Sequence, residues 1–176
     1  ATLAKKYDFD YWDGDRRINY GGYKYIENRW LPVAQKIKNY YNLGPTSKIL
    51  DVGCGKGFLL FEFLKLMPKA EIFGIDISKY AIANCKSEIK NQLVVGNANK
   101  LDWPDNYFDL VISINTIHNL ELEDCITSIK EISRVSKVNS FLTKLRETNI
   151  KHKIKRDKCI FIFTYILLSI QLLIEE

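Results

Sequence analysis

The sequence has few of the residues that build metal sites. It holds four cysteines and two histidines among 176 residues, and no C-x-x-C pair occurs. A structural zinc site takes four cysteine or histidine ligands, usually supplied as closely spaced pairs. We therefore expect no metal.

Long apolar runs are also scarce. The longest, Cys159–Ile174, has 16 residues and includes Thr164, Ser169 and Gln171. A helix that spans a bilayer needs about 20 apolar residues, so this run predicts a buried or surface-seeking helix. Residues 1–13 contain no apolar run preceded by lysines, which a secretory signal would need, and we expect a cytoplasmic protein.

The body of the chain lacks an excess of one charge. The formal net charge is +5, but 8 of the 26 basic residues and only 4 of the 21 acidic residues lie beyond residue 136. A nucleic-acid-binding face needs a folded basic stripe, so we expect no nucleic-acid partner. Because 47% of the residues are hydrophobic, the chain can bury the core of one domain.

What the chain does contain is an alternation of apolar strands and helices. Expected strands cover residues 48–52, 71–75, 93–95 and 108–114; expected helices cover 30–43, 58–67, 79–89 and 123–136. The first helix should end at Gly44 and the following proline, whereas Tyr7–Tyr25 shows no periodicity and reads as an ordered loop. Strands apolar on both faces and joined by helices predict an α/β fold with a doubly wound, mostly parallel sheet, Rossmann-like in architecture.

The sharpest local signal is a strand followed by a glycine-rich turn, Ile49–Phe58. Gly53, Gly55 and Gly57 allow a tight turn and a close approach of the backbone to a ligand, because no Cβ intervenes. The spacing is G-x-G-x-G, and Phe58 stands where a dinucleotide fingerprint closes with glycine. The turn therefore departs from the pyrophosphate-binding form.

Two carboxylates flank this turn. Asp76 ends the second expected strand, 21 residues beyond Gly55, where a carboxylate can accept hydrogen bonds from both hydroxyls of a ribose. Asp51 adds a negative charge at the end of the first strand. This pair would repel phosphates and attract a cation, and S-adenosylmethionine has an ammonium and a sulfonium but no phosphate.

At this point the sequence resembles the class I S-adenosylmethionine-dependent methyltransferases, over roughly residues 48–135. Asp51–Gly57 resembles the first motif of the family and Gly74–Ser78 the second. Residues 94–111 resemble the third and fourth motifs, and the helix that ends at Val135 matches the helix after the fourth strand of the family.

The resemblance implies S-adenosylmethionine as the cofactor and a set of residues that contact it: Asp51, Gly53, Cys54, Gly55, Gly57, Asp76, Ile77, Asn97, Ala98 and Asn115. Asp51 and the turn amides would hold the methionine part, Asp76 the ribose, and Asn97 with Ala98 the adenine edge. The family commonly has aspartate at Asn97, but an amide oxygen can also accept from an adenine amino group. Asn115 stands where the family's residues pass between cofactor and acceptor. Cys54 is interpreted as a small packing residue rather than a nucleophile.

The amino-terminal piece Tyr11–Arg17 resembles a subgroup of bacterial methyltransferases for small-molecule or saccharide acceptors, and implies a lid over the cofactor. Since the sulfonium already activates the methyl group, the protein chiefly has to align an acceptor atom with the S–CH3 bond. A base is needed only if that atom keeps its proton. The candidates are His118, Asp13 and Asp15, and His118 can equally be a polar loop residue.

The pattern fails after Val135. The family continues with a turn, a fifth strand, a helix and a hairpin; Ser140–Thr143 fits the start of that strand, but the rest is a basic stretch and an apolar run. We predict a lid over residues 1–27, a cofactor-binding domain over 28–143, and an atypical tail over 144–176 that leaves the carboxyl-terminal strands incomplete. One hypothesis is a lost reading frame near residues 141–146. The alternative is a lineage-specific tail that covers the sheet edge or touches a membrane surface.

Two functions stay open. One is methyl transfer to a small-molecule or saccharide-like acceptor, and the other is a cofactor-binding module without activity. A nicotinamide oxidoreductase ranks third because of Phe58. The sequence predicts neither the acceptor nor the oligomeric state.

Overall fold

A computed structural model describes residues 7–15, 17, 23–137 and 140–142 of the chain. The tail over residues 144–176 lies outside the described residues, and so do the helix and the membrane contact considered for it and part of the expected lid. Within the described ranges, no helix is both long enough and apolar enough to cross a membrane.

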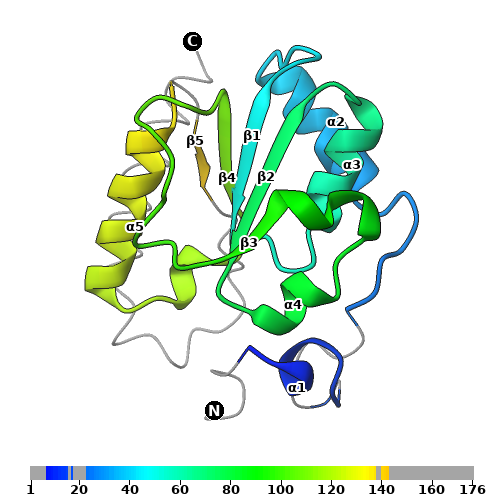
Figure 1. Ribbon diagram of the computed structural model, residues 1–176, viewed down its shortest axis with the longest axis vertical. Coiled ribbons are helices and arrows are strands. Elements are labelled where there is room, and N and C mark those ends of the chain that lie inside the picture. Colours follow the sequence, from blue (N-terminus) through cyan, green and yellow to red (C-terminus); the bar gives the residue numbers. More distant parts are fainter. Residues whose placement is uncertain (1–6, 16, 18–22, 138–139, 143–176) are drawn as a thin grey trace.

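The core of the fold is a sheet of five parallel strands (Figure 1). They are β1 (Lys48–Val52), β2 (Glu71–Asp76), β3 (Leu93–Val95), β4 (Leu110–Ser113) and β5 (Ser140–Leu142), in the order β3-β2-β1-β4-β5. The chain runs outward from β1 to β3 and then crosses to β4 on the other side of β1. The predicted doubly wound parallel sheet is confirmed, and the segment expected to begin a fifth strand forms β5.

Apolar side chains leave the strands toward both faces. On β1, Ile49 belongs to one buried cluster and Leu50 to the other; on β4, Leu110 and Val111 divide in the same way. Because successive side chains of a strand point to opposite faces, both faces of the sheet have to be covered.

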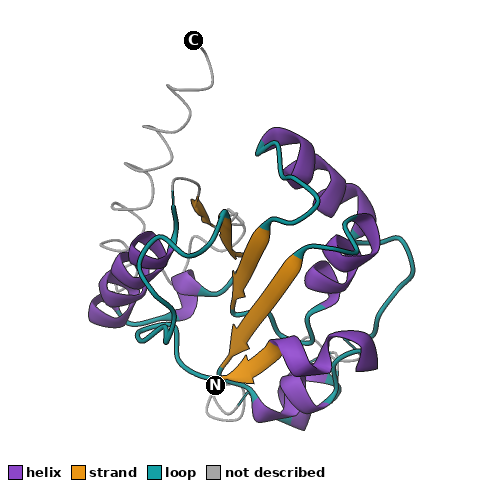
Figure 2. Cartoon of the chain, turned by 45° about the horizontal axis from the view of Figure 1, so that its top comes forward, coloured by secondary structure: helices purple, strands orange, loops and turns teal. Residues whose placement is uncertain are grey.

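Helices supply that cover (Figure 2). The face carrying Ile49 packs against α2 (Leu31–Tyr40) and α3 (Phe58–Leu66), and the opposite face packs against α5 (Leu122–Val135). The smaller elements are α1 (Phe9–Trp12), α4 (Lys79–Ala83), and the 3-10 helices η2 (Ser87–Gln92) and η3 (Ile117–Asn119). Polar groups at the carboxyl ends of the strands therefore meet between the two layers of helices.

The expected helix over residues 79–89 was too long. In the structure α4 ends at Ala83, and the side chain of Asn84 turns back to donate a hydrogen bond to the carbonyl of Tyr80 (2.8 Å). Lys86 then adopts an extended conformation before η2 begins. The apolar spacing of the segment could not show this break, because Asn84 ends the helix through its own side chain.

Two other local expectations were wrong. The helix expected to end at Gly44 stops at Tyr40, and Asn42 adopts the left-handed conformation (φ 50°). Asn tolerates this conformation better than other non-glycine residues. The amino-terminal segment, expected to be a loop, contains one helical turn, α1, whose first amide donates to the side chain of Asp8.

Arg134 of α5 fastens the loop between β3 and β4. Its guanidinium donates to the carbonyls of Leu101 (2.7 Å) and Trp103 (2.9 Å) and pairs with the carboxylates of Glu131 and Asp105, each at 2.8 Å. The loop that carries Asn97 and Ala98 is thus joined to α5 at its far end.

Candidate functional site

The two carboxylates predicted from the sequence lie on neighbouring strands. Asp51 precedes the last residue of β1 and Asp76 ends β2; Asp51 pairs with Gly74 in the register of the two strands. Both side chains are buried, with residue exposures of 5% and 8%. Their burial beside the glycine turn concentrates negative charge at this edge of the sheet.

Asp76 is held by two backbone amides. Its Oδ2 accepts a hydrogen bond from the amide of Gly55 and its Oδ1 from the amide of Ser78, both at 2.8 Å. Burial raises the pKa of Asp76, and these two amides counteract that effect. The carboxylate therefore joins the glycine turn to the start of α4, where the Ser78 side chain caps the helix by accepting from Ala81 (3.0 Å).

Asp51 has no such support. No residue in the described part of the chain donates a hydrogen bond to its carboxylate, and burial together with the nearby Asp76 raises its pKa to about 7. Leaving a buried carboxylate without a donor is costly. The chemistry of this position fits a ligand that brings its own positive charge, such as an ammonium group.

The glycine turn is a conformation that other residues resist. Gly53, Gly55 and Gly57 all have φ between 56° and 80°. A Cβ at Gly53 would lie 2.0 Å from the hydroxyl of Thr116, and a Cβ at Gly55 would lie 2.7 Å from the ring of Trp12. In the structure, therefore, protein side chains occupy the space that these two glycines leave free.

Trp12 comes from the amino-terminal segment, which lies against the glycine turn and α4. The indole N–H donates to the hydroxyl of Ser78 (2.9 Å) and to the carbonyl of Tyr7 (3.2 Å). The amide of Tyr23 donates to the carbonyl of Trp12 (3.0 Å), and the centroids of the two rings are 5.3 Å apart. Trp12 itself is 9% exposed, so this segment covers part of the turn as a lid would.

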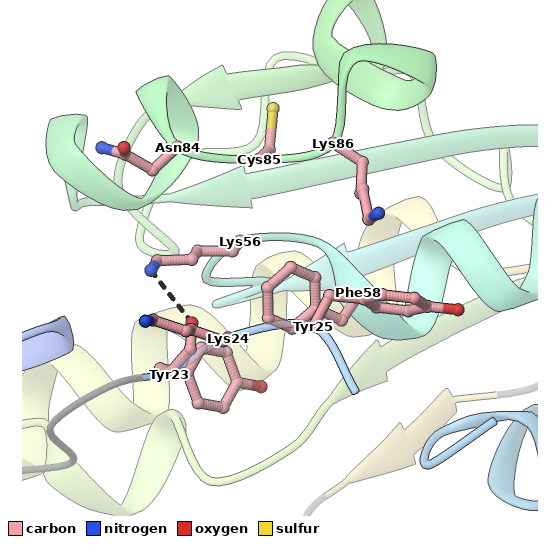
Figure 3. A pocket seen from close by; sticks show the side chains of 8 residues that line it. All are labelled: Tyr23, Lys24, Tyr25, Lys56, Phe58, Asn84, Cys85 and Lys86. Carbon is pink, nitrogen blue, oxygen red and sulfur yellow. Dashed lines mark hydrogen bonds between the residues drawn. The ribbon is translucent and has the colours of Figure 1, made fainter. Parts of the chain in front are cut away.

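Lys56, inside the glycine turn, is a site residue that the sequence analysis missed. Its Nζ lies 2.8 Å from a carboxylate oxygen of Asp13 and donates to the carbonyl of Tyr23 (2.9 Å), the contact drawn in Figure 3. The hydroxyl of Tyr80 also donates to Asp13 (2.7 Å). From the sequence, a lysine in such a turn suggests a ligand contact. Its partner, Asp13, lies 43 residues earlier in the chain, so only the folded structure reveals the contact.

These contacts also involve Asp13, which the sequence analysis named as a candidate base. Burial tends to raise the pKa of Asp13, but the hydrogen bonds from Lys56 and Tyr80 outweigh it and lower the pKa. Asp15 pairs with Arg17. His118 lies in η3, and its side chain is outside the described residues.

The remaining candidates lie around the strand ends. Ile77 follows Asp76 with 56% of its surface exposed, which is unusual for a large apolar residue. Asn97 is exposed and accepts from the amide of Asn99 (3.0 Å), while Ala98 packs toward the cluster under α5. Asn115 follows β4 in the left-handed conformation (φ 58°).

Cys54 is buried within the turn and packs into the cluster beside α2 and α3. Burial raises the pKa of its thiol well above the ordinary value, which makes it unreactive. This agrees with its interpretation as a packing residue.

A separate cavity of about 230 Å³ opens between the amino-terminal segment, the glycine turn and the connection from α4 to η2 (Figure 3). Tyr23, Lys56 and Phe58 line it together with Lys86. It contains neither Asp51 nor Asp76 in its lining, so it is distinct from the position of the two carboxylates.

Comparison with known proteins places this geometry in a family. Residues 50–143 match a family model described as a methyltransferase domain. An uncharacterised methyltransferase of Schizosaccharomyces pombe is 28% identical over 109 residues, which are 55% of this chain and 38% of that protein. The malonyl-[acyl-carrier protein] O-methyltransferase of Legionella pneumophila is 33% identical over 107 residues, which are 58% of this chain and 37% of that protein. The chain thus spans about two fifths of the length of these relatives.

A solved structure agrees. The crystal structure of an S-adenosylmethionine-dependent methyltransferase from Methanosarcina mazei has a TM-score of 0.51 and 26% identity, and the match covers 57% of this chain and 52% of that one. The family match covers β1 from Leu50 onward, the other four strands, the glycine turn and both carboxylates. The chain therefore belongs to the methyltransferase-domain family of S-adenosylmethionine-dependent enzymes.

Proposed function

We propose that this chain binds S-adenosylmethionine at the carboxyl ends of β1 and β2 and transfers its methyl group to a small-molecule or saccharide-like acceptor. The observation that carries the proposal is Asp51, a buried carboxylate without a hydrogen-bond donor in the described part of the chain. A cationic ligand would supply the missing charge.

The other residues fit the remaining parts of the same ligand. Asp76 already orients both oxygens through the amides of Gly55 and Ser78, and each oxygen keeps a lone pair for a ribose hydroxyl. Ile77 offers an exposed apolar surface next to that carboxylate, suited to the face of adenine. Asn97 and Ala98, at the end of β3, would meet the adenine edge.

The cofactor, when bound, supplies a methyl group activated by a sulfonium. The chain would orient it for in-line displacement and exclude water with the lid that Trp12 belongs to. Asp13 is a poor general base in this arrangement because its carboxylate already accepts from Lys56 and Tyr80. The proposal therefore assigns no base, and favours an acceptor atom that is already nucleophilic.

The test is calorimetric titration with S-adenosylmethionine, S-adenosylhomocysteine and NAD, followed by mass spectrometry of acceptor mixtures for a gain of one methyl group. Asp51→Asn and Asp76→Asn should each weaken binding of S-adenosylmethionine. Asp109→Asn is the matched control, since Asp109 lies at the opposite end of the sheet beside Lys48. Tighter binding of NAD than of S-adenosylmethionine would refute the proposal.

The acceptor screen separates the two functions left open by the sequence. Binding with turnover supports the methyltransferase, whereas binding without turnover for any acceptor class supports a cofactor-binding module. The matched residues make up 38% of one curated relative and 37% of the other, so the acceptor of neither relative is carried over to this chain without the screen.

A further inference from the structure

We propose that Lys56 is a positioning residue that sets the affinity for the cofactor by holding Trp12 of the lid against Gly55 and Ser78. The inference rests on the proposed function and adds to it a contact between the lid and the glycine turn. It concerns the four residues Asp13, Lys56, Tyr80 and Tyr23, which we call the latch.

The ammonium of Lys56 directs all three of its N–H donors to the amino-terminal segment. Its Nζ lies 2.9 and 2.8 Å from the two carboxylate oxygens of Asp13 and 2.9 Å from the carbonyl of Tyr23. An ammonium has three N–H donors, so these three acceptors satisfy it. The side chain is only 6% exposed. Lys56 is therefore a fastening for the lid and is not free to contact a ligand.

Asp13 extends the latch to a second element. Its carboxylate also accepts from the hydroxyl of Tyr80 in α4, at 2.7 Å. One carboxylate thus links the lid to the glycine turn and to the helix that follows Asp76. Burial of such a pair makes each partner dependent on the other, because removal of one leaves an uncompensated charge.

Both ends of the latch border Trp12. Asp13 is its neighbour in sequence, and the amide of Tyr23 donates to its carbonyl (3.0 Å). The indole then touches the two residues whose amides hold Asp76: its N–H donates to the hydroxyl of Ser78 (2.9 Å), and its ring lies 2.7 Å from where a Cβ on Gly55 would be. The lid therefore shields the hydrogen bonds that orient the carboxylate proposed to hold the ribose.

From these contacts the direction of the effect follows. Without the ion pair, the lid loses its fastening and water reaches the amides of Gly55 and Ser78, which weakens their hold on Asp76. The latched lid is thus expected to favour the bound cofactor. If Trp12 instead obstructed the site, loss of the latch would strengthen binding, so the sign of the change decides between the two.

The experiment is a titration of the full chain with S-adenosylhomocysteine, followed by calorimetry. Lys56→Met and Asp13→Asn each remove one charge of the pair, and Tyr80→Phe is a milder variant that removes one hydroxyl. Lys137→Met is the control: it breaks an ion pair with Asp109 (2.6 Å) at the opposite end of the sheet. In a background with Trp30→Phe and Trp103→Phe, Trp12 is the only tryptophan, and its emission reports on the lid.

We expect Lys56→Met and Asp13→Asn to weaken binding roughly 5- to 150-fold, the usual range for coupled sites, and Tyr80→Phe to weaken it less. The double variant should bind about as weakly as the single ones, because both changes break one contact. Trp12 emission should respond to the ligand in the background protein and lose that response in Lys56→Met, a readout that lower stability alone would not change. Lys137→Met should bind normally.

Equal or tighter binding by Lys56→Met and Asp13→Asn, beside normal binding by the background protein, would overturn the inference and leave the proposed function intact. Absence of binding by the unmodified chain would overturn the proposed function, and the inference with it.

Discussion

Cofactor binding should depend steeply on pH between pH 5 and pH 7, because Asp51 titrates in this range. Burial and Asp76 raise the pKa of Asp51 to about 7 in the free protein. A cationic ligand favours the ionised form, so the protonated fraction of the protein binds poorly. About half of the Asp51 side chains are ionised at pH 7 and about 1% at pH 5. The dissociation constant for S-adenosylhomocysteine should therefore rise about 50-fold from pH 7 to pH 5.

The ligand does not produce this change itself, because an α-amino group with an ordinary pKa near 8 stays protonated throughout the range. Calorimetry at pH 7 in two buffers of different ionisation enthalpy should show about half a proton released on binding. Asp51→Asn should bind more weakly at pH 7 and lose most of the pH dependence. A change of less than about threefold in the unmodified protein, or the same slope in Asp51→Asn, would refute the role given to Asp51.

Three further predictions concern stability. The pKa of Asp51 in the folded protein lies above its unfolded value, so its contribution to the free energy of unfolding is present below about pH 4 and is lost as the pH rises through about 7. The loss is on the order of 4 kcal/mol. Chemical denaturation should therefore show Asp51→Asn to be more stable than the parent at pH 8 but not at pH 4. Gly55→Ala should cost about 1–3 kcal/mol from the left-handed backbone, and more where its Cβ meets Trp12. Gly44→Ala should cost far less, because its Cβ would meet only the hydroxyl of Ser47, at an ordinary contact distance of 4.0 Å. Equal effects in urea melts would contradict this reasoning. Arg134→Lys should lower the free energy of unfolding by about 2 kcal/mol, because one ammonium cannot replace the guanidinium that reaches two carbonyls and two carboxylates. Retention of full stability would refute the importance of that geometry.

The sheet was predictable because its signal is local. Strands β1 and β4 carry apolar residues on both faces, as Ile49 and Leu50 show for β1. Strand β1 is followed by the glycine turn, and β2 by a helix with its own N-cap. Asp51 and Asp76 could be placed at the strand ends for the same reason. That the two share one edge follows from the parallel topology, which confines strand ends to one side of the sheet.

The latch was not predictable because its partners are far apart in sequence. Lys56 and Asp13 are separated by 43 residues and Tyr80 and Asp13 by 67. Nothing in the periodicity of either segment requires the contact. The interpretation of Tyr7–Tyr25 as an ordered loop identified the lid segment but not the side chains that fasten it, since an ion pair of this kind depends on the tertiary position of a segment that holds only one helical turn, α1, among its described residues.

Burial of a carboxylate is not by itself the mark of a binding site in this fold, as a comparison of Asp51 with Glu62 shows. Glu62 of α3 is completely buried, but its Oε1 accepts from the hydroxyl of Tyr25 (2.5 Å) and the Nζ of Lys65 lies 3.1 Å from its Oε2. The chain thus supplies Glu62 with a donor at Oε1 and a counter-charge near Oε2, although Oε2 accepts no hydrogen bond from the described residues. Its role is to join the amino-terminal segment to α3. Asp51 receives neither from the described residues. A protein that compensates one buried carboxylate and leaves the other bare loses stability at the second position, and a cation bound from solution is the partner that would restore it.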